Sequence, residues 1–258
     1  MFDASSDKAA PGRSLPHWRV ALFVLFGVIF LFFASQTVGG LVLGIYAALQ
    51  HWNAAQIQTW LTHSTSAQFM YGLIAEGFMV VGIGFALRWL GWNWKDIGLM
   101  RPKLRHLLVG FISVVPYFVF YLILVAILSA IFPTLNVGQK QDIGFTNVHS
   151  ALDFTLTFIA LVILPPIAEE ITMRGFLYTG LKKWLPTLVA ALVVSVLFGA
   201  AHLAEGGDSG PLWIGAVDTF TLSLVLVFLR EKTGNLWAGM VLHATKNLIA
   251  FASLFLIK

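Results

Sequence analysis

Six polar residues in the C-terminal half could support proton transfer or bind an oxyanion, although they lie within long apolar stretches: Glu169, Glu170, Arg174, His202, His243 and Asn247. They fall in three short clusters, namely Glu169–Arg174, Phe198–His202 and His243–Asn247. Carboxylates and imidazoles can take a proton from a water molecule, and imidazole or amide N–H groups can stabilise a developing oxyanion. These residue types therefore indicate hydrolytic chemistry, provided that the fold brings the three clusters together.

The first cluster, EEITMR, separates a paired carboxylate from a free one. Glu170 and Arg174 are four residues apart and share a helix face, so an ion pair would lower the cost of burying both. Glu169 is rotated by about 100° from Glu170 and stays available as a catalytic base. The alternative interpretation is a structural salt-bridge cluster that locks helix packing.

The other two clusters are weaker patterns when each is taken alone. His202 closes the run VLFGAAH, and a histidine at a helix end is more often an interfacial or packing residue than a catalyst. His243 and Asn247, in HATKN, share a helix face and could bind a carbonyl oxygen or an oxyanion. Hydrogen bonding between helices is the alternative role for this pair.

The composition shows what surrounds these residues. Of 258 residues, 58% are hydrophobic and 11% are charged, whereas a soluble domain carries about 25% charged residues. With no cysteine, this composition excludes a soluble globule, a disordered chain and a disulfide scaffold. The net charge of +4 comes from basic residues that flank apolar runs, which is typical of membrane topology signals rather than of nucleic-acid binding.

A membrane-spanning helix needs about 20 mainly apolar residues. Seven stretches meet this requirement: 20–47, 69–89, 106–132, 156–182, 186–204, 211–229 and 235–257. They predict an all-α, polytopic transmembrane helix bundle of about seven spans. The first stretch is too long for the apolar region of a signal peptide, so we interpret it as a retained span.

The basic residues predict the orientation of the bundle. With the N-terminus inside, 12 of the 16 lysine and arginine residues lie on the inner side, and only Lys140 and Lys258 lie outside. A break at Gly39 and Gly40 would add an eighth crossing and reverse all later spans. The charge asymmetry favours seven spans.

Depth along the helices tests whether the clusters can meet. If the fourth span ends at Lys182, Glu169 lies about 20 Å along it and His202 lies about 24 Å along the next span. The last cluster lies about 12–18 Å into its own span by the same rise. The clusters then overlap in depth, whereas a fourth span that ended at Arg174 would place Glu169 and His202 near opposite faces.

Other polar residues in the apolar runs have plainer explanations. Glu76 and Asp218 are interpreted as hydrogen-bonded packing residues, and Lys246 as a residue that snorkels or neutralises a nearby carboxylate. Pro165 and Pro166, just before the glutamate pair, predict a kink or a helix start that opens the backbone to water and substrate.

The three clusters resemble, in order and spacing, the EExxxR, FxxxH and HxxxN motifs of the CPBP intramembrane protease family. The stretch REKTGNLWAGMVLHA also resembles the family's approach to its last motif. This family includes the type II CAAX prenyl endopeptidases and the Abi proteins of bacteriocin processing and self-immunity. The resemblance covers roughly residues 150–250, which are the last four predicted spans.

The resemblance implies an intramembrane endopeptidase with a four-helix catalytic core. Residues 1–150 would form the N-terminal tail and the first three spans, and residues 151–258 the catalytic bundle of the same membrane domain. Glu169 would activate the hydrolytic water together with His202, while Glu170 and Arg174 hold that carboxylate in place. His243 and Asn247 would stabilise the tetrahedral oxyanion.

The resemblance leaves the cofactor open, because both a metalloprotease and a metal-free glutamate mechanism are proposed in the family. The sequence lacks the HExxH arrangement typical of zinc proteases. Two histidines and a glutamate could still hold Zn²⁺ with an open position. We favour the metal-free mechanism, so no cofactor is expected.

The expected partners are the lipid bilayer and a membrane-associated peptide or protein, processed in the manner of a CAAX terminus or of a leader or bacteriocin. No nucleic acid is expected. The compact, cysteine-free chain favours a multi-pass protein of the bacterial inner membrane.

Two other classes of function remain as alternatives. A proton-coupled transporter could use the intramembrane acids and His202 as a relay, and the acids in question are Glu76, Glu169, Glu170 and Asp218. Such a transporter would show symmetry between its halves, and none is visible in the sequence. A catalytically silent membrane scaffold of the same fold is the other alternative.

Overall fold

The computed structural model describes residues 15–257, without the side chains of residues 208 and 209. In this range every regular element is helical, which confirms the all-α class. The elements are α1 His17–Leu49, α2 Ala54–His63, α3 Thr65–Leu90, α4 Leu104–Ile112, α5 Val114–Ile131, α6 Ala151–Phe158, η1 Ile159–Ile163, α7 Leu164–Glu169, η2 Glu170–Leu177, α8 Tyr178–Leu181, α9 Thr187–Ala201, η3 His202–Ser209, α10 Trp213–Thr233 and α11 Trp237–Phe255. The polar tail with Lys8 and Arg13, and Lys258 at the other end, lie outside the described residues.

Within residues 15–257, seven helices are long and apolar enough to cross a membrane. They are α1, α3, α4–α5, α6–α8, α9 extended to Gly207, α10 and α11. The predicted number of spans is confirmed. Helix α1 runs unbroken through Gly39 and Gly40, so the break that would have added an eighth crossing does not occur there.

The fourth span, Ala151–Leu181, is a continuous helix with two wide π-helical segments, η1 and η2. Pro165 and Pro166 stand just after η1, at the start of α7. Proline has no backbone N–H, so the regular hydrogen-bond ladder fails there and the helix winding changes. The span ends at Leu181, which confirms the boundary on which the predicted meeting of the clusters depended.

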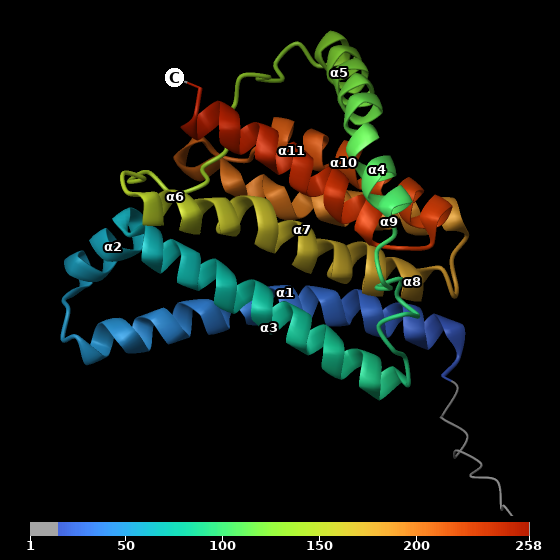
Figure 1. Ribbon diagram of the computed structural model, residues 1–258, viewed down its shortest axis with the longest axis horizontal. Helices are drawn as coiled ribbons and strands as arrows, with labels where there is room; N and C mark the ends of the chain where they lie inside the picture. The colour runs from blue at the N-terminus through green and yellow to red at the C-terminus, as the bar shows by residue number, and fades with distance from the viewer. Residues whose placement is uncertain (1–14, 258) are drawn as a thin grey trace, which may run out of the picture.

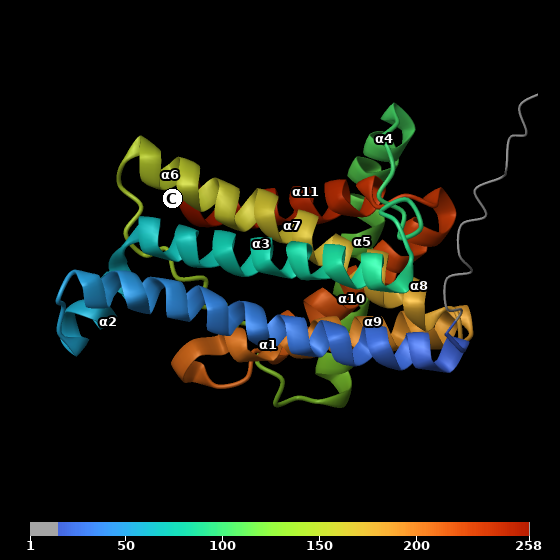
Figure 2. The ribbon, with the colours of Figure 1, turned by 90° about the horizontal axis from the view of Figure 1, so that it is seen from below.

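The fourth span lies in the middle of the bundle (Figure 1). Helices α1 and α3 pack along one side of it, and α9, α10 and α11 along the other. Figure 2, which views the bundle from below, shows α1 and α3 side by side in front. Apolar side chains that are fully or almost fully buried, such as Ile83, Phe176 and Val194, fill the space between these helices. Many large apolar side chains on the outer surface are exposed, as expected of a bundle that faces lipid.

The two ends of the bundle differ in charge. At the end where α1 begins and α8 and α10 end lie most of the basic residues, and we call it the basic end: Arg19, Arg88, Lys95, Arg101, Lys103, Arg105, Lys182, Lys183, Arg230 and Lys232. The opposite end, here the loop end, carries α2, residues 132–150 and η3. In Figure 1 the basic end lies at the right and α2 at the left.

Candidate active site

A cavity of about 270 Å³ lies inside the bundle and reaches residues 132–150 and η3 at the loop end. Its walls come from α3, residues 132–150, the fourth span, η3, α10 and α11. Four of the six predicted site residues line it, namely Glu169, His202, His243 and Asn247. The predicted convergence of three separate helices on one site is therefore seen in the structure.

A second cavity, of about 320 Å³, shares part of this wall. Both cavities are lined by four ionisable side chains: Glu76, Glu169, His202 and Glu205. The second cavity adds apolar side chains and Gln36 from α1. The shared acids and imidazole thus stand between a polar chamber and a more apolar one.

A chain of ionisable groups runs from the buried core to the first cavity. The guanidinium NH1 of Arg174 lies 3.0 Å from Glu170 Oε1, and the two side chains are 0% and 1% exposed. Glu170 Oε1 lies 3.4 Å from His243 Nδ1, and His243 Nε2 lies 3.8 Å from Glu169 Oε2. Of these four groups Glu169 is the most open, at 25% exposed.

The two adjacent glutamates have different surroundings in this chain of contacts. Glu170 is buried with its countercharge, because an unpaired carboxylate in a low-dielectric interior would be very costly. It lines neither cavity and faces His243 instead. Glu169, one residue earlier, reaches both cavities and can meet water. The helix rotation predicted from the sequence produces this division.

Two neighbouring residues accommodate the buried Arg174–Glu170 pair. The Arg174 guanidinium carbon lies 4.2 Å from the centre of the Phe198 ring, a cation–π contact. Gly239 lies opposite Glu170, and a Cβ atom at this position would come within 2.8 Å of Glu170 Oε2. Only a residue without a side chain leaves room for the carboxylate there. The sequence pattern alone did not single out Gly239.

The environment of His202 defines which ring nitrogen is free. Its Nδ1 lies 2.7 Å from the carbonyl oxygen of Phe198. A carbonyl can only accept a hydrogen bond, so Nδ1 carries the proton and Nε2 of the neutral ring keeps its lone pair. Helix α9 ends at Ala201 and tightens into η3, which leaves the Phe198 carbonyl for the ring. His202 therefore presents a proton acceptor to the cavities.

Asn247 lines the first cavity and also hydrogen-bonds to the backbone of the fourth span. Its Nδ2 donates a hydrogen bond of 2.9 Å to the carbonyl of Leu161. That carbonyl lies four residues before Pro165 and five before Pro166, so neither an α-helical nor a π-helical N–H is available to it. One amide hydrogen of Asn247 thus links α11 to the fourth span. It satisfies the carbonyl that the two prolines leave without a backbone donor.

Sequence reasoning missed Glu205, which accepts a hydrogen bond of 2.7 Å from Gln141 Nε2 and lies 4.0 Å from His202 Nε2. Its position three residues after His202 was the available signal. Glu76 was interpreted as a hydrogen-bonded packing residue. It instead lines both cavities, and no side-chain hydrogen bond or ion pair is seen for it among residues 15–257.

Asp218 and Lys246 also line the first cavity. Lys246 Nζ lies 2.9 Å from Asp218 Oδ2, and the hydroxyl of Tyr117 donates to the same carboxylate. Both sequence interpretations hold for this pair, because Asp218 is hydrogen-bonded within the bundle and Lys246 neutralises a carboxylate.

The side chains do not form a ready metal site. Across the described part of the chain, no group of three or more His, Asp or Glu side chains is placed to hold a metal ion. His202 has committed Nδ1 to the Phe198 carbonyl, and His243 faces a carboxylate through each ring nitrogen. This arrangement does not fit the Zn²⁺ alternative, so we derive no catalytic step through a metal.

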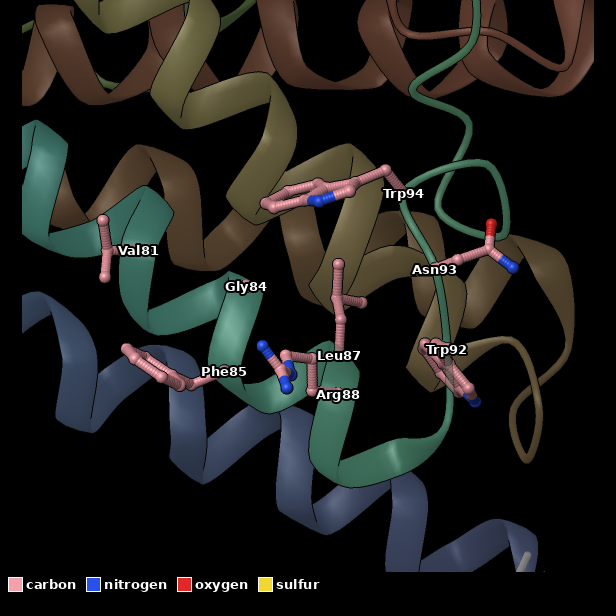
Figure 3. Close-up of a pocket in the computed structure, with 8 residues that line it drawn as sticks. All are labelled: Val81, Gly84, Phe85, Leu87, Arg88, Trp92, Asn93 and Trp94. Atoms are coloured by element: carbon pink, nitrogen blue, oxygen red, sulfur yellow. The ribbon is translucent and has the colours of Figure 1, made fainter.

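Another cavity, of about 380 Å³, lies at the basic end (Figure 3). It is lined by the end of α3 and the turn that follows, with Arg88, Trp92 and Trp94 among its residues. None of its lining residues carries a carboxylate or an imidazole. It offers apolar contact and one cation, but no group that could act as a base.

Fold and site together define a multi-pass helical membrane protein with an internal glutamate–histidine site. Comparison with known families identifies this class more closely. Residues 151–249 match the family model described as type II CAAX prenyl endopeptidase Rce1-like. The resemblance inferred from the three motifs is confirmed over that segment.

A curated relative is named only as the uncharacterized protein YyaK of Bacillus subtilis (strain 168). It is 29% identical over 179 residues, which cover 66% of this chain and 56% of the relative. The chain thus spans little more than half the length of the relative that it matches. No solved structure matches the chain.

Proposed function

We propose that this protein is an intramembrane endopeptidase that hydrolyses a peptide bond in a membrane-associated peptide or protein. The observation that carries the proposal is that Glu169 and His202, from two different spans, line the same two cavities. The family match supports a CAAX-type protease family. The buried Arg174–Glu170 pair supports a pre-built site, because Glu170 also contacts His243 on the next wall of the cavity.

In the proposed reaction, Glu169 takes a proton from a water molecule held between its carboxylate and Nε2 of His202. The water oxygen forms a bond to the carbonyl carbon of the peptide, and the C–O π electrons move to oxygen. When the tetrahedral intermediate collapses, the C–N bond breaks and the proton on Glu169 passes to the leaving amine. The products are a carboxylic acid and an amine, and Glu169 returns to its starting state.

The other predicted residues act around this step. His243 and the second amide hydrogen of Asn247 would face the oxyanion, since both residues line the cavity. Glu170 and Arg174 hold His243 rather than Glu169 directly, because Glu170 contacts Nδ1 of that ring. Glu170 is thus a positioning residue in this proposal, and the ring that it positions is that of His243.

The proposed substrate is a peptide segment near a membrane, of the CAAX type or of the leader or bacteriocin type. The proposed location is the bacterial inner membrane, with lipid as the other partner and no role for nucleic acid. We propose a metal-free mechanism. Exhaustive chelation with metal analysis checks it: activity should be unchanged, and loss that returns only with Zn²⁺ would refute this part of the proposal.

The proposal is tested by comparing the membrane peptides of cells that carry the wild-type protein or the Glu169→Gln variant. At least one membrane peptide should accumulate uncut in the variant cells, and the purified wild-type protein should cleave it. The matched control is Glu231→Gln, since Glu231 lies at the basic end and pairs with Lys182. Equal cleavage by wild-type and Glu169→Gln proteins would refute the assignment.

A further inference from the structure

The charge of the two ends orients the bundle in a membrane. In residues 15–257, ten lysine and arginine residues lie at the basic end, and Lys140 lies in the loop-end segment 132–150. Loops that stay in the cytoplasm carry an excess of lysine and arginine. The basic end therefore faces the cytoplasm and the loop end faces the opposite side.

Both cavities that contain Glu169 and His202 reach the loop end. Their walls include Gln141 and Ile143 from residues 132–150, Ala204 and Glu205 from η3, and Leu254 near the end of α11. No residue of the turns at the basic end lines either cavity.

The basic end is closed to the site by packed side chains. Glu169 lies 12 residues before Leu181, which corresponds to about 18 Å of helix. Phe176 and Leu177 lie between them, and Ile97 and Leu236 come from the turns at the basic end. All four side chains are buried in the described structure, at 0–1% exposed. A peptide entering from the basic end would have to displace this core.

An aromatic cluster gives independent support for a water interface at the loop end. Trp52 and Trp60 contact each other and Tyr46, with ring centroids 5.2–6.0 Å apart. Trp60 belongs to α2, a short helix with no buried residue, which lies beside the end of α1 (Figure 1). Tryptophan and tyrosine are enriched where a membrane meets water.

From these observations we propose that the active site opens on the extracytoplasmic side of the membrane. It then takes peptide segments presented on that side by exported or membrane-anchored substrates, and not prenylated C-termini held on the cytoplasmic leaflet. The substrate class rests on the proposed function, whereas the direction of opening rests only on charge, packing and cavity position.

The natural absence of cysteine allows a direct test with single-cysteine variants of the full chain. Lys140→Cys reports the loop end, Ala204→Cys reports the second cavity, and Lys95→Cys reports the basic end. All three positions are exposed. Bacterial spheroplasts carrying each variant are treated with a membrane-impermeant sulfonated maleimide, before and after permeabilisation.

Lys140→Cys and Ala204→Cys should be labelled equally with and without permeabilisation, and Lys95→Cys should be labelled only after it. The opposite pattern would overturn the proposal, as would an Ala204→Cys thiol that reacts only in permeabilised cells. The cysteine-free wild-type protein is the control for background.

Labelling requires no cleavage, so this result is separate from the proposed protease function. An outward-facing but inactive protein would refute the protease proposal alone. If the protein is active, the peptides that accumulate in Glu169→Gln cells should carry their cleavage sites on the extracytoplasmic side. Cleavage sites on the cytoplasmic side would overturn the substrate class.

Discussion

The two cavity regions of this protein differ in chemistry more than in size. The cavity at the basic end measures about 380 Å³, and the one beside Glu169 and His202 about 270 Å³. The larger is lined by tryptophans and one arginine, whereas the smaller holds four carboxylates, two imidazoles and a lysine. Space alone therefore does not mark the candidate site. What marks it is the set of ionisable groups that the bundle gathers in its interior.

The two regions differ in whether their charged side chains are exposed or are buried with a partner. At the basic end, charged side chains lie near the surface, and Arg88 is exposed. In the interior beside the candidate site, Glu170 and Arg174 are buried as a pair, and Asp218 is held by Lys246 and Tyr117. Desolvated charges are costly unless they are paired. A fold that retains so many of them in one place indicates a function for that place.

The largest expected effect is the loss of the catalytic base or its partner. Glu169→Gln or His202→Ala should lower cleavage of the peptide that accumulates in variant cells by about 10²–10⁴-fold, the usual contribution of a positioned acid or base. Both variants should still insert and fold, as judged by gel filtration and thermal unfolding in detergent. Full activity in either variant would contradict the mechanism.

The next effect concerns stability. Arg174→Ala would leave the Glu170 carboxylate buried without its countercharge, which should destabilise the fold by about 3–5 kcal/mol. The measurement is thermal unfolding in detergent. Arg88→Ala at the basic end is the matched control and should change stability by about 0.5 kcal/mol or less. If the two arginine variants unfold at the same temperature, the ion pair with Arg174 is not what makes burial of the Glu170 carboxylate tolerable.

Variants at Asn247 separate the contribution of this residue to protein stability from its contribution to cleavage. Asn247→Ala leaves the Leu161 carbonyl without its donor and should cost about 1–3 kcal/mol. The double variant Pro165→Ala with Asn247→Ala restores a backbone N–H four residues after Leu161. It should recover most of the lost stability while cleavage stays low, because the oxyanion donor is still missing. Recovery of cleavage in the double variant would show that Asn247 acts only by anchoring α11.

The smallest effect is expected at the other cavity. Arg88→Gln should leave the cleavage rate within about twofold of the wild-type rate, because this side chain lines only the basic-end cavity and exposed substitutions are usually near neutral. A loss comparable to that of Glu169→Gln would show that both cavities serve the reaction, and the contrast between the two regions would fail.

The sequence by itself determined that the helices of this protein lie in lipid, and it determined most of the local helix geometry. A charged fraction of 11% required lipid around the helices, and apolar runs of sufficient length predicted the seven spans. The i, i+4 spacing of Glu170 and Arg174 predicted their ion pair, because helix periodicity places such residues on one face. The three motifs likewise predicted the resemblance that the family model finds over residues 151–249.

Only the tertiary structure decided which distant residues complete the site. Glu205 meets Gln141, 64 residues earlier, and Asn247 meets the Leu161 carbonyl, 86 residues earlier. Glu76 and Gln36 reach the same cavity from spans outside the matched segment. Helix periodicity determines the face on which a residue lies, but the partner of that face depends on how the spans pack. Packing within lipid follows from side-chain fit between helices far apart in sequence, which no local pattern records.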